Sequence, residues 1–294
     1  MLVLGGSASN GLDIALSKEL GADLVKIQTV RFPDGEIKVR VPEDIKKDDK
    51  IVIVQSTYWP QEKNMFELLF TAYELKQRKA NVCAVIPYLA YARQNMSFTP
   101  GEAISINAVI DMMGVVGIKS IVTVNPHKHE SLDHFKGKTC IANAATTMAK
   151  GINGKINDPF VLAPDKSALV VAKPIADELG CEYSYIDKAR DQYGNVTIKK
   201  AHAANFKDKD VIICDDMISA GSTIEQASRF AYGEGAGSVS AACVHLVMVK
   251  GAYERLKGAG VTKIFGSNTI PFEGTEIIDV SPDIAKCVKN IYSK

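Results

Sequence analysis

The sequence predicts an α/β protein with two tandem domains, each a mostly parallel sheet flanked by helices. Short apolar runs typical of buried strands alternate with amphipathic helical stretches along the chain, a pattern that favours parallel sheets covered by helices. Residues 51–56 also align with residues 211–216 at an offset of 160 (211 − 51), and a helix and a second apolar strand follow both segments. This internal similarity indicates two copies of one domain.

The composition limits the classes of partner. The 294 residues suffice for two domains of ordinary size, and 46% hydrophobic residues suffice for substantial cores. Lysine and arginine number 35 against 34 acids, so the net charge of +1 gives no general attraction to nucleic acid or membranes. No apolar run approaches the roughly 20 residues that span a bilayer. We therefore expect no nucleic-acid or membrane partner, and any polyanion site must be a local concentration of charge.

The cysteines favour a reducing compartment. They are scattered without a C-x-x-C pair, and several lie in apolar runs typical of strands. We expect all of them to be reduced core residues of a cytoplasmic protein, and a zinc site has little support. The six residues are Cys83, Cys140, Cys181, Cys214, Cys243 and Cys287.

The chain begins with a predicted strand at 2–4, a loop rich in glycine and serine, and a helix at 12–20. Neither G-x-G-x-x-G nor G-x-x-x-x-G-K-[ST] occurs, so the two common nucleotide fingerprints are not supported. Strands are predicted at 25–27 and 37–41, with a turn at 31–36 because of its Pro-Asp-Gly core. On the residues alone, this segment is interpreted as a hairpin turn.

Polar residues follow several of the later strands, and ligands of parallel sheets bind beyond the carboxyl ends of strands. Arg93 and Gln94 are candidates for polyanion contact, although solvated surface positions would explain them equally well. The strands are predicted at 51–54, 82–86 and 120–124, and the helices at 64–78 and 104–113.

Two further positions carry possible ligands for a metal ion. His127 and His129 lie two residues apart after a strand and would face the same side if the strand continued, although Pro126 weakens that inference. An imidazole there suits a metal or a phosphate oxygen, but a lone histidine is more often a surface or packed residue. Asp165 ends the apolar run 160–163 and is interpreted either as a ligand for magnesium or a ribose hydroxyl, or as a turn aspartate.

A strand at 183–186 leads into a polar segment with Lys188 and Arg190. Their spacing of two turns both side chains the same way in an extended chain, where they would stabilise charge on a transferring phosphoryl group. The alternative is a solvated hairpin with paired charges.

The segment 211–224 carries the strongest signal. A buried strand is followed by Asp215 and Asp216, a turn of small residues at 219–223 and a helix at 224–231. Strand, tight turn and helix N-terminus form the geometry that binds a phosphate, because backbone N–H groups approach the anion closely. The two acids would then hold sugar hydroxyls or a metal ion. A strand-to-helix turn without a ligand is the alternative, and the complete run Asp-Asp-x-x-x-x-Gly-x-Thr favours the ligand site.

The two copies are not equivalent. The first has Gln55 and Ser56 where the second has two acids, so we expect the first site to have lost its sugar-phosphate role. The boundary is expected between Phe135 and Ala144, because Lys136-Gly137-Lys138 indicates an exposed turn, and we divide the chain into domains 1–139 and 140–294. The last helix, 284–292, is expected to pack back on the first domain.

Together, these motifs resemble the ribose-phosphate diphosphokinase family, the phosphoribosyl pyrophosphate synthetases. The resemblance covers the whole chain, and the Ser-Ala-Gly-Ser-Thr turn is most similar to the archaeal branch. The motifs that carry it are Phe32-Pro33-Asp34-Gly35-Glu36, Tyr91-Ala92-Arg93-Gln94, Pro126-His127, Pro164-Asp165, Lys188-x-Arg190 and Asp215-Asp216 through Thr223.

The resemblance implies two phosphoribosyltransferase-type domains and a magnesium-dependent reaction. The family transfers the β,γ-diphosphate of ATP to the C1 hydroxyl of ribose 5-phosphate, which gives phosphoribosyl pyrophosphate and AMP for nucleotide biosynthesis. The adenine contacts would come from a neighbouring subunit, so a homodimer or higher homo-oligomer is implied.

The same resemblance assigns roles to individual positions. Lys188 would be the catalytic lysine and Arg190 its partner, and His127 and Asp165 would be magnesium sites. The ATP contacts would be Phe32, Asp34, Gly35, Glu36, Arg93 and Gln94. The ribose 5-phosphate contacts would be Arg190, Asp215, Asp216, Ser219, Ala220, Gly221, Ser222 and Thr223.

The chain departs from the family pattern at Asn95, where relatives commonly have aspartate, at Lys166, where smaller residues are expected, and at Ser219, which replaces an acid. Two other functions were weighed. A phosphoribosyltransferase would leave the degenerate first copy and the 32–36 turn without a purpose. A non-catalytic subunit of the same fold is disfavoured because Lys188 and Arg190 are both retained.

Overall fold

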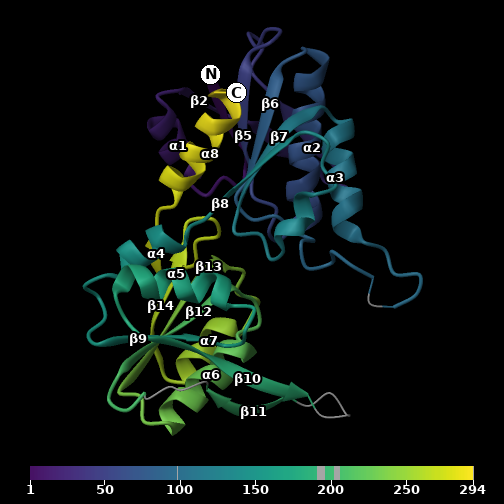
Figure 1. Ribbon diagram of the computed structural model, residues 1–294. Helices are drawn as coiled ribbons and strands as arrows, with labels where there is room; N and C mark the ends of the chain where they lie inside the picture. The colour runs from purple at the N-terminus through teal and green to yellow at the C-terminus, as the bar shows by residue number, and fades with distance from the viewer. Residues whose placement is uncertain (98, 191–195, 202–205, 294) are drawn as a thin grey trace. The chain divides into compact units, whose positions relative to one another are not determined.

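The computed structural model describes residues 1–97, 99–190, 196–201 and 206–293, with the backbone alone for residues 188–190 and 196–201. The chain divides into two compact units (Figure 1). Unit 1 comprises Met1–Asn143, Asn268–Ile270 and Val280–Lys294, and unit 2 comprises Ala144–Ser267 and Pro271–Asp279. The predicted division at 139/140 stays a prediction about folding domains.

Unit 1 is built on a six-stranded sheet in which every neighbouring pair runs parallel, in the order β2-β1-β5-β6-β7-β8. The strands are β1 (Leu2–Gly5), β2 (Asp23–Lys26), β5 (Lys50–Val54), β6 (Asn81–Ile86), β7 (Ile118–Val124) and β8 (Lys138–Ala142). The helices are α1 (Leu12–Leu20), α2 (Gln61–Gln77), α3 (Ser105–Val115), the 3-10 helix η1 (His129–Leu132) and α8 (Ser281–Ser293).

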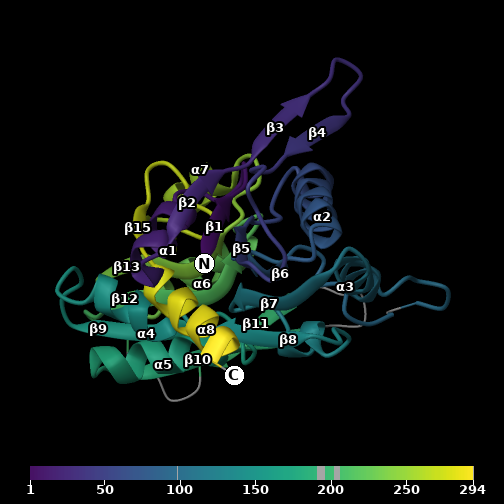
Figure 2. The same cartoon turned by 90° about the horizontal axis from the view of Figure 1, so that it is seen from above.

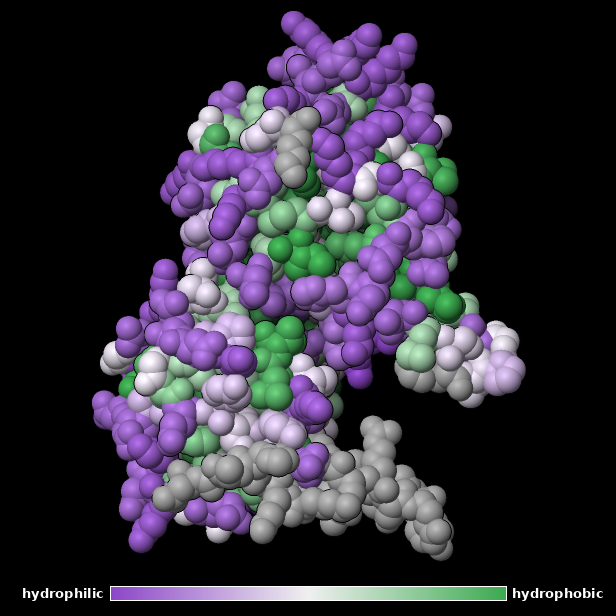
Figure 3. Space-filling view, in the orientation of Figure 1, coloured by the Kyte–Doolittle hydropathy of each residue, from purple (hydrophilic) through white to green (hydrophobic). Residues whose placement is uncertain are grey.

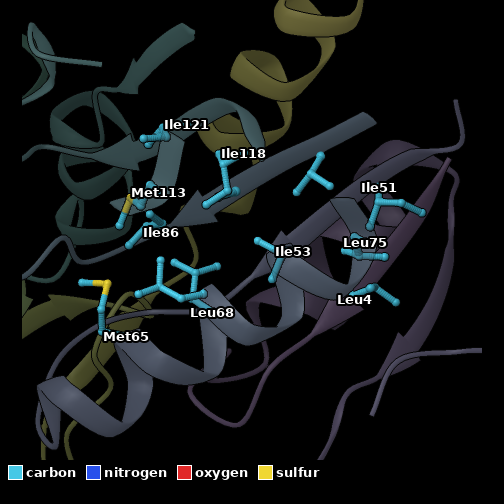
Figure 4. Close-up of a cluster of buried hydrophobic side chains, with 14 of the residues drawn as sticks. Leu4, Ile51, Ile53, Met65, Leu68, Leu75, Ile86, Met113, Ile118 and Ile121 are labelled. Atoms are coloured by element: carbon cyan, nitrogen blue, oxygen red, sulfur yellow. The ribbon is translucent and has the colours of Figure 1, made fainter. Parts of the chain in front are cut away.

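Helices cover both faces of this sheet, as the alternating pattern predicts. Figure 1 shows α1 and α8 on one face and α2 and α3 on the other. The side chains drawn in the close-up view of the core beneath α2 and α3 are aliphatic or sulfur-containing, and there Ile53 and Ile86 of the sheet lie near Leu68 and Met65 of α2 (Figure 4). Apolar residues at three- and four-residue spacing on α2 therefore bury one face of the helix.

A two-stranded hairpin of β3 (Gln28–Arg31) and β4 (Ile37–Arg40) projects from unit 1 (Figure 2). The sequence predicted the turn and the second strand, but the strand predicted at 25–27 does not form the hairpin. Val25 and Lys26 belong to β2 and extend the main sheet beside β1, and β3 forms the hairpin instead. The chain changes sheets at Ile27, a break that alternation of residues alone does not reveal.

Unit 2 contains a seven-stranded sheet in the order β11-β10-β9-β12-β13-β14-β15, parallel except for the β10–β11 pair. Figure 1 shows α4 and α5 on one face and α6 and α7 on the other. The strands are β9 (Pro159–Ala163), β10 (Tyr183–Arg190), β11 (Val196–Ala201), β12 (Asp210–Ile218), β13 (Ser238–Leu246), β14 (Val261–Ser267) and β15 (Glu276–Ile278). The helices are α4 (Ala145–Ile152), α5 (Leu169–Leu179), α6 (Ser222–Gly233) and α7 (Ala252–Gly258).

The two sheets have the same strand order when β2-β1-β5-β6-β7-β8 is matched with β10-β9-β12-β13-β14-β15. β5 and β12, the strands aligned by the 160-residue offset, occupy equivalent places, as the internal repeat predicts. In unit 2 the chain leaves β9 towards β10 on one side and leaves β12 towards β13 on the other. Open α/β sheets bind ligands at such a switch point, which lies between β9 and β12 in unit 2 and between β1 and β5 in unit 1.

The prediction that all six cysteines are reduced is wrong for two of them. Cys140 of β8 and Cys287 of α8 form a disulfide, while Cys83, Cys181, Cys214 and Cys243 are free thiols. The bonded residues are 147 positions apart in sequence, and only the return of α8 to unit 1 brings them together. The Tyr292 hydroxyl, near the end of the same helix, contacts the carbonyls of Ile51 and Asn81 at 3.1 and 3.2 Å.

Hydrophilic residues cover most of the face drawn in Figure 3, with hydrophobic residues in smaller groups between them. Among the described helices, none combines the length and the apolar character needed to cross a membrane.

Candidate active site

The two acids of the 211–224 segment lie where β12 loses one of its neighbours. The sequence predicted that the strand is followed by these two acids. Instead, β12 continues through them to Ile218, because its pairing with β13 extends to the pair Ile218 and Leu246. Its pairing with β9 stops at Ile213. Asp215 and Asp216 therefore occupy the part of β12 beyond the end of β9, at the switch point of the unit 2 sheet.

The turn after β12 leaves backbone donors available. Gly221 has a φ of 78°, in the left-handed region, and precedes α6. Within the described part of the chain, the backbone N–H groups of residues 220–223 donate to no carbonyl and no side chain. Such a row of N–H groups at the start of a twelve-residue helix is suited to an anion.

Three carboxylates, Asp165, Asp215 and Asp216, influence one another at this site, and their negative charges repel. Withdrawal from water raises the pKa of Asp215 well above its usual range, and the carboxylates of Asp216 and Asp165 raise it further. The influence of Asp165 places the end of β9 and the end of β12 in one electrostatic site. A cation or a hydrogen-bond donor would relieve this repulsion.

Asp165 is held by its own loop. Its Oδ1 accepts hydrogen bonds from the Ser167 N–H at 2.9 Å, the Ser167 hydroxyl at 2.5 Å and the Ala168 N–H at 3.2 Å. The turn-aspartate interpretation is therefore correct for one oxygen, and Oδ2 points to no described donor. Magnesium binds through one or two carboxylates together with substrate phosphates and water, so a fixed carboxylate beside Asp215 and Asp216 fits that ion. Among the described residues, no group of three or more His, Cys, Asp or Glu side chains forms a complete metal site.

Lys188 and Arg190 lie near the end of β10, paired with Ile198 and Val196 of β11. Their side chains lie outside the described part of the structure. β10 and β11 pair antiparallel, which agrees with the backbone of the hairpin interpretation.

The predicted ATP residues of the 32–36 turn lie at the tip of the β3–β4 hairpin. The Phe32 N–H donates to the Glu36 carbonyl at 2.8 Å, and the Glu36 N–H donates to Asp34 Oδ1 at 3.1 Å. Gly35 has a φ of 99°, a backbone conformation that glycine adopts readily because it has no Cβ atom. Phe32 is 43% exposed.

A hollow of about 640 Å³ lies between this hairpin and α2, lined by Arg31, Gly35, Glu36, Lys63, Phe66 and Phe70 among others. Arg31, Phe66 and Phe70 were not predicted as site residues from the sequence. The two phenylalanines could have been noticed in the sequence, because both lie off the predicted apolar face of the helix at 64–78. In the structure, Phe66 and Phe70 are 49% and 44% exposed.

Arg93, Gln94 and His127 belong to unit 1. Arg93 and His127 are exposed, whereas the Gln94 amide donates to Glu102 at 2.7 Å and thereby closes its own loop. The strand before His127 ends at Val124, and His129 begins η1. The argument that His127 and His129 face one side of a continued strand is therefore wrong.

Known proteins match nearly the whole chain. Residues 1–117 match the model of the N-terminal domain of ribose phosphate pyrophosphokinase, and residues 131–274 match the phosphoribosyl transferase domain. The ribose-phosphate pyrophosphokinase of Saccharolobus solfataricus is 47% identical over 97% of this chain and 99% of the relative. That of Sulfolobus acidocaldarius is 45% identical over 97% and 99%.

The fold is similar to a solved structure as well. The crystal structure of phosphoribosylpyrophosphate synthetase from Mycobacterium smegmatis matches with a TM-score of 0.86 and 27% identity, covering 99% of both chains. The strand order described above is therefore that of a known two-domain fold.

Proposed function

Because the chain belongs to the ribose-phosphate pyrophosphokinase family, we propose that it transfers the β,γ-diphosphate of ATP to the C1 hydroxyl of ribose 5-phosphate. The products are phosphoribosyl pyrophosphate, a precursor in nucleotide biosynthesis, and AMP. The single observation that carries the proposal is the switch point of unit 2, where N–H donors at 220–223 lie beside Asp215 and Asp216.

The 5-phosphate of the sugar binds at the turn after β12 in this proposal. Ser219, Ala220, Gly221, Ser222 and Thr223 surround it with backbone N–H groups and hydroxyls, which bind a phosphate without a charged side chain. The ribose hydroxyls are acceptors and donors that match Asp215 and Asp216. A sugar that donates hydrogen bonds to these carboxylates also lowers the cost of keeping both charged.

A divalent magnesium ion fits the carboxylate of Asp165 in unit 2, and His127 in unit 1 is likewise proposed as a magnesium site. When bound, the ion would neutralise charge on the diphosphate. The chain's own residues then orient the two substrates. The C1 hydroxyl is a poor nucleophile, so alignment with the β-phosphorus and stabilisation of the transferring group supply most of the rate.

Lys188 and Arg190 are proposed as the cations that contact the transferring diphosphate from β10. The proposed ATP contacts are Arg93 and Gln94 together with Phe32, Asp34, Gly35 and Glu36 at the hairpin tip of a neighbouring subunit. That arrangement requires a homodimer or a larger homo-oligomer, and a cytoplasmic location is part of the proposal.

Phosphorus NMR of purified protein with ATP, magnesium and ribose 5-phosphate tests the reaction. The expected result is the joint appearance of AMP and a phosphoribosyl pyrophosphate signal. ADP together with ribose 1,5-bisphosphate would show transfer of the γ-phosphoryl group alone and would refute the proposed placement of ATP. Binding of ribose 5-phosphate without turnover would favour a non-catalytic subunit.

A further inference from the structure

The loop after β1 in unit 1 donates hydrogen bonds to a carboxylate of the same chain. The Ser7 N–H donates to Glu67 Oε1 at 2.7 Å, and the Ser7 hydroxyl donates to Oε2 at 2.5 Å. Lys63 donates to Oε2 at 2.7 Å and also contacts the Ser7 hydroxyl. A backbone amide, a hydroxyl and an ammonium group therefore converge on one carboxylate of α2.

This carboxylate is withdrawn from solvent. The Glu67 side chain is 0% exposed, whereas Lys63 is 25% exposed. Burial alone would raise the pKa of Glu67, but hydrogen bonds from Lys63 and Ser7 lower it below its usual value. The surrounding donors thus hold a buried anion in its charged form, as the donors of a ligand site hold a bound anion.

The same loop lies at the switch point of the unit 1 sheet, between β1 and β5. Other groups of unit 1 accept hydrogen bonds from the neighbouring donors at this switch point. Gln55 Oε1 accepts from the Ala8 N–H at 3.0 Å. The Thr269 carbonyl accepts from the Asn10 amide at 3.0 Å and from the Ser56 hydroxyl at 3.3 Å. The end of this sheet where a ligand would bind is therefore occupied by the chain itself.

Unit 2 fills the equivalent loop in another way. The offset that aligns β5 with β12 places Glu67 opposite Ala227 (227 − 67 = 160), a buried residue of α6 that offers no acceptor. The loop after β9 donates instead to Asp165 Oδ1, a carboxylate of the loop itself. The two copies of the fold thus differ in where the carboxylate comes from: a neighbouring helix in unit 1 and the loop in unit 2.

We propose that the Ser7 loop is an oxyanion site that the chain fills with the Glu67 carboxylate. With Glu67 shortened, the site takes a small carboxylate or a tetrahedral oxyanion. Acetate is the closest match, because Glu67→Ala removes one methylene and one carboxylate. This inference goes beyond the proposed function and does not depend on it, since it concerns unit 1 and needs neither ATP nor a sugar.

Thermal unfolding of the full chain with added anions tests the proposal. Wild type, Glu67→Ala and the control Glu74→Ala are melted in sodium acetate and in sodium chloride of equal ionic strength. Glu74 is a suitable control because it lies on the same helix but is exposed and pairs only with Arg78 among its described partners. Glu67→Ala is expected to melt below wild type and to regain Tm with acetate, by about 3 to 5 °C for each tenfold rise above the acetate Kd.

Wild type and Glu74→Ala are expected to respond equally to acetate and chloride. Inorganic phosphate is expected to stabilise Glu67→Ala more than wild type, since the proposed phosphate site at 220–223 is common to both, and competition with acetate would place the additional gain at the Ser7 loop. If Glu67→Ala unfolds without anion, refolding in acetate replaces the melt, and Glu67→Asp serves as the second variant. A Glu67→Ala protein that acetate, formate and phosphate stabilise or refold no more than they do wild type, beside a folded Glu67→Asp protein with no additional gain either, would overturn the proposal.

Discussion

Replacing both Cys140 and Cys287 with serine removes the cross-link that ties α8 to β8 within unit 1. The two cysteines are 147 residues apart, and nearly all of the chain between them belongs to unit 2. A disulfide stabilises a protein largely by restricting the unfolded chain, and the effect grows with the length of the closed loop. The expected loss therefore depends on whether unit 2 unfolds together with unit 1.

The free energy that the disulfide contributes depends on the length of free chain in the closed loop, which differs between the two cases. If the whole chain unfolds together, a loop of 147 residues is worth about 5 kcal/mol. If unit 2 stays folded, the free chain in the loop is limited to residues 141–143, 268–270 and 280–286, and a loop of that size is worth about 3 kcal/mol. Division by the unfolding entropy of the part that melts gives a fall in Tm of about 8 to 9 °C in both cases.

The assay is calorimetry without reductant, preceded by titration of free thiols in denaturant to establish that wild type carries four. Cys181→Ser is the control, because Cys181 is a half-buried free thiol. Addition of a reductant to wild type is expected to lower its Tm to that of the double serine variant. Six reactive thiols in unreduced wild type would refute the cross-link, and an unchanged Tm despite a proven cross-link would refute the loop-entropy argument.

Three other predictions concern single residues. Lys188→Ala is expected to lower turnover by several orders of magnitude with an unchanged circular dichroism spectrum, and near-normal activity would contradict its catalytic role. Gly221→Ala forces a side chain into the left-handed region (φ 78°), so a loss of roughly 1 kcal/mol or more in stability and weaker ribose 5-phosphate binding are expected in melts and titrations. Gly233→Ala, with open space around it, is the matched control and should not destabilise. Glu67 has a lowered pKa, so its stabilisation is present above the usual glutamate pKa and is lost as the pH falls through the lowered value. The Tm of Glu67→Gln should lack that acid-dependent part, and parallel Tm curves for variant and wild type would contradict this.

The sequence predicts the secondary structure of unit 1 well where periodicity is strong. α1 was predicted at 12–20 and is found at Leu12–Leu20, because a glycine at each end and apolar residues facing the sheet define the helix locally. In unit 2, β14, β15 and α7 were not predicted. β15 and α7 have only three and seven residues. β14 is as long as the predicted β7, but the exposed Thr262 and Lys263 interrupt its apolar run.

The site could be predicted only in part, for a related reason. Asp215, Asp216 and Gly221 could be selected as candidates from the sequence because their strand, turn and helix are consecutive in the chain. The Ser7–Glu67 contact and the Cys140–Cys287 bond join residues 60 and 147 positions apart, and no local pattern indicates such pairs. The hollow beside the hairpin likewise combines β3 with α2.

The backbone donors of two loops show why a phosphate is expected at one of them and not at the other: the Ser7 loop after β1 in unit 1 and the turn after β12 in unit 2. A parallel sheet with a switch point exposes loop N–H groups at its carboxyl edge in both units, and a buried N–H group without an acceptor is costly. In unit 1, Glu67 and Gln55 satisfy the Ser7 and Ala8 N–H groups. In unit 2, the described groups leave the N–H groups of residues 220–223 without a partner from the chain. An incoming phosphate would therefore compete only with water in unit 2, whereas in unit 1 it would have to displace a buried carboxylate held by three donors. The turn after β12 is therefore a more accessible phosphate site than the Ser7 loop, even though the strand order of the two units is the same.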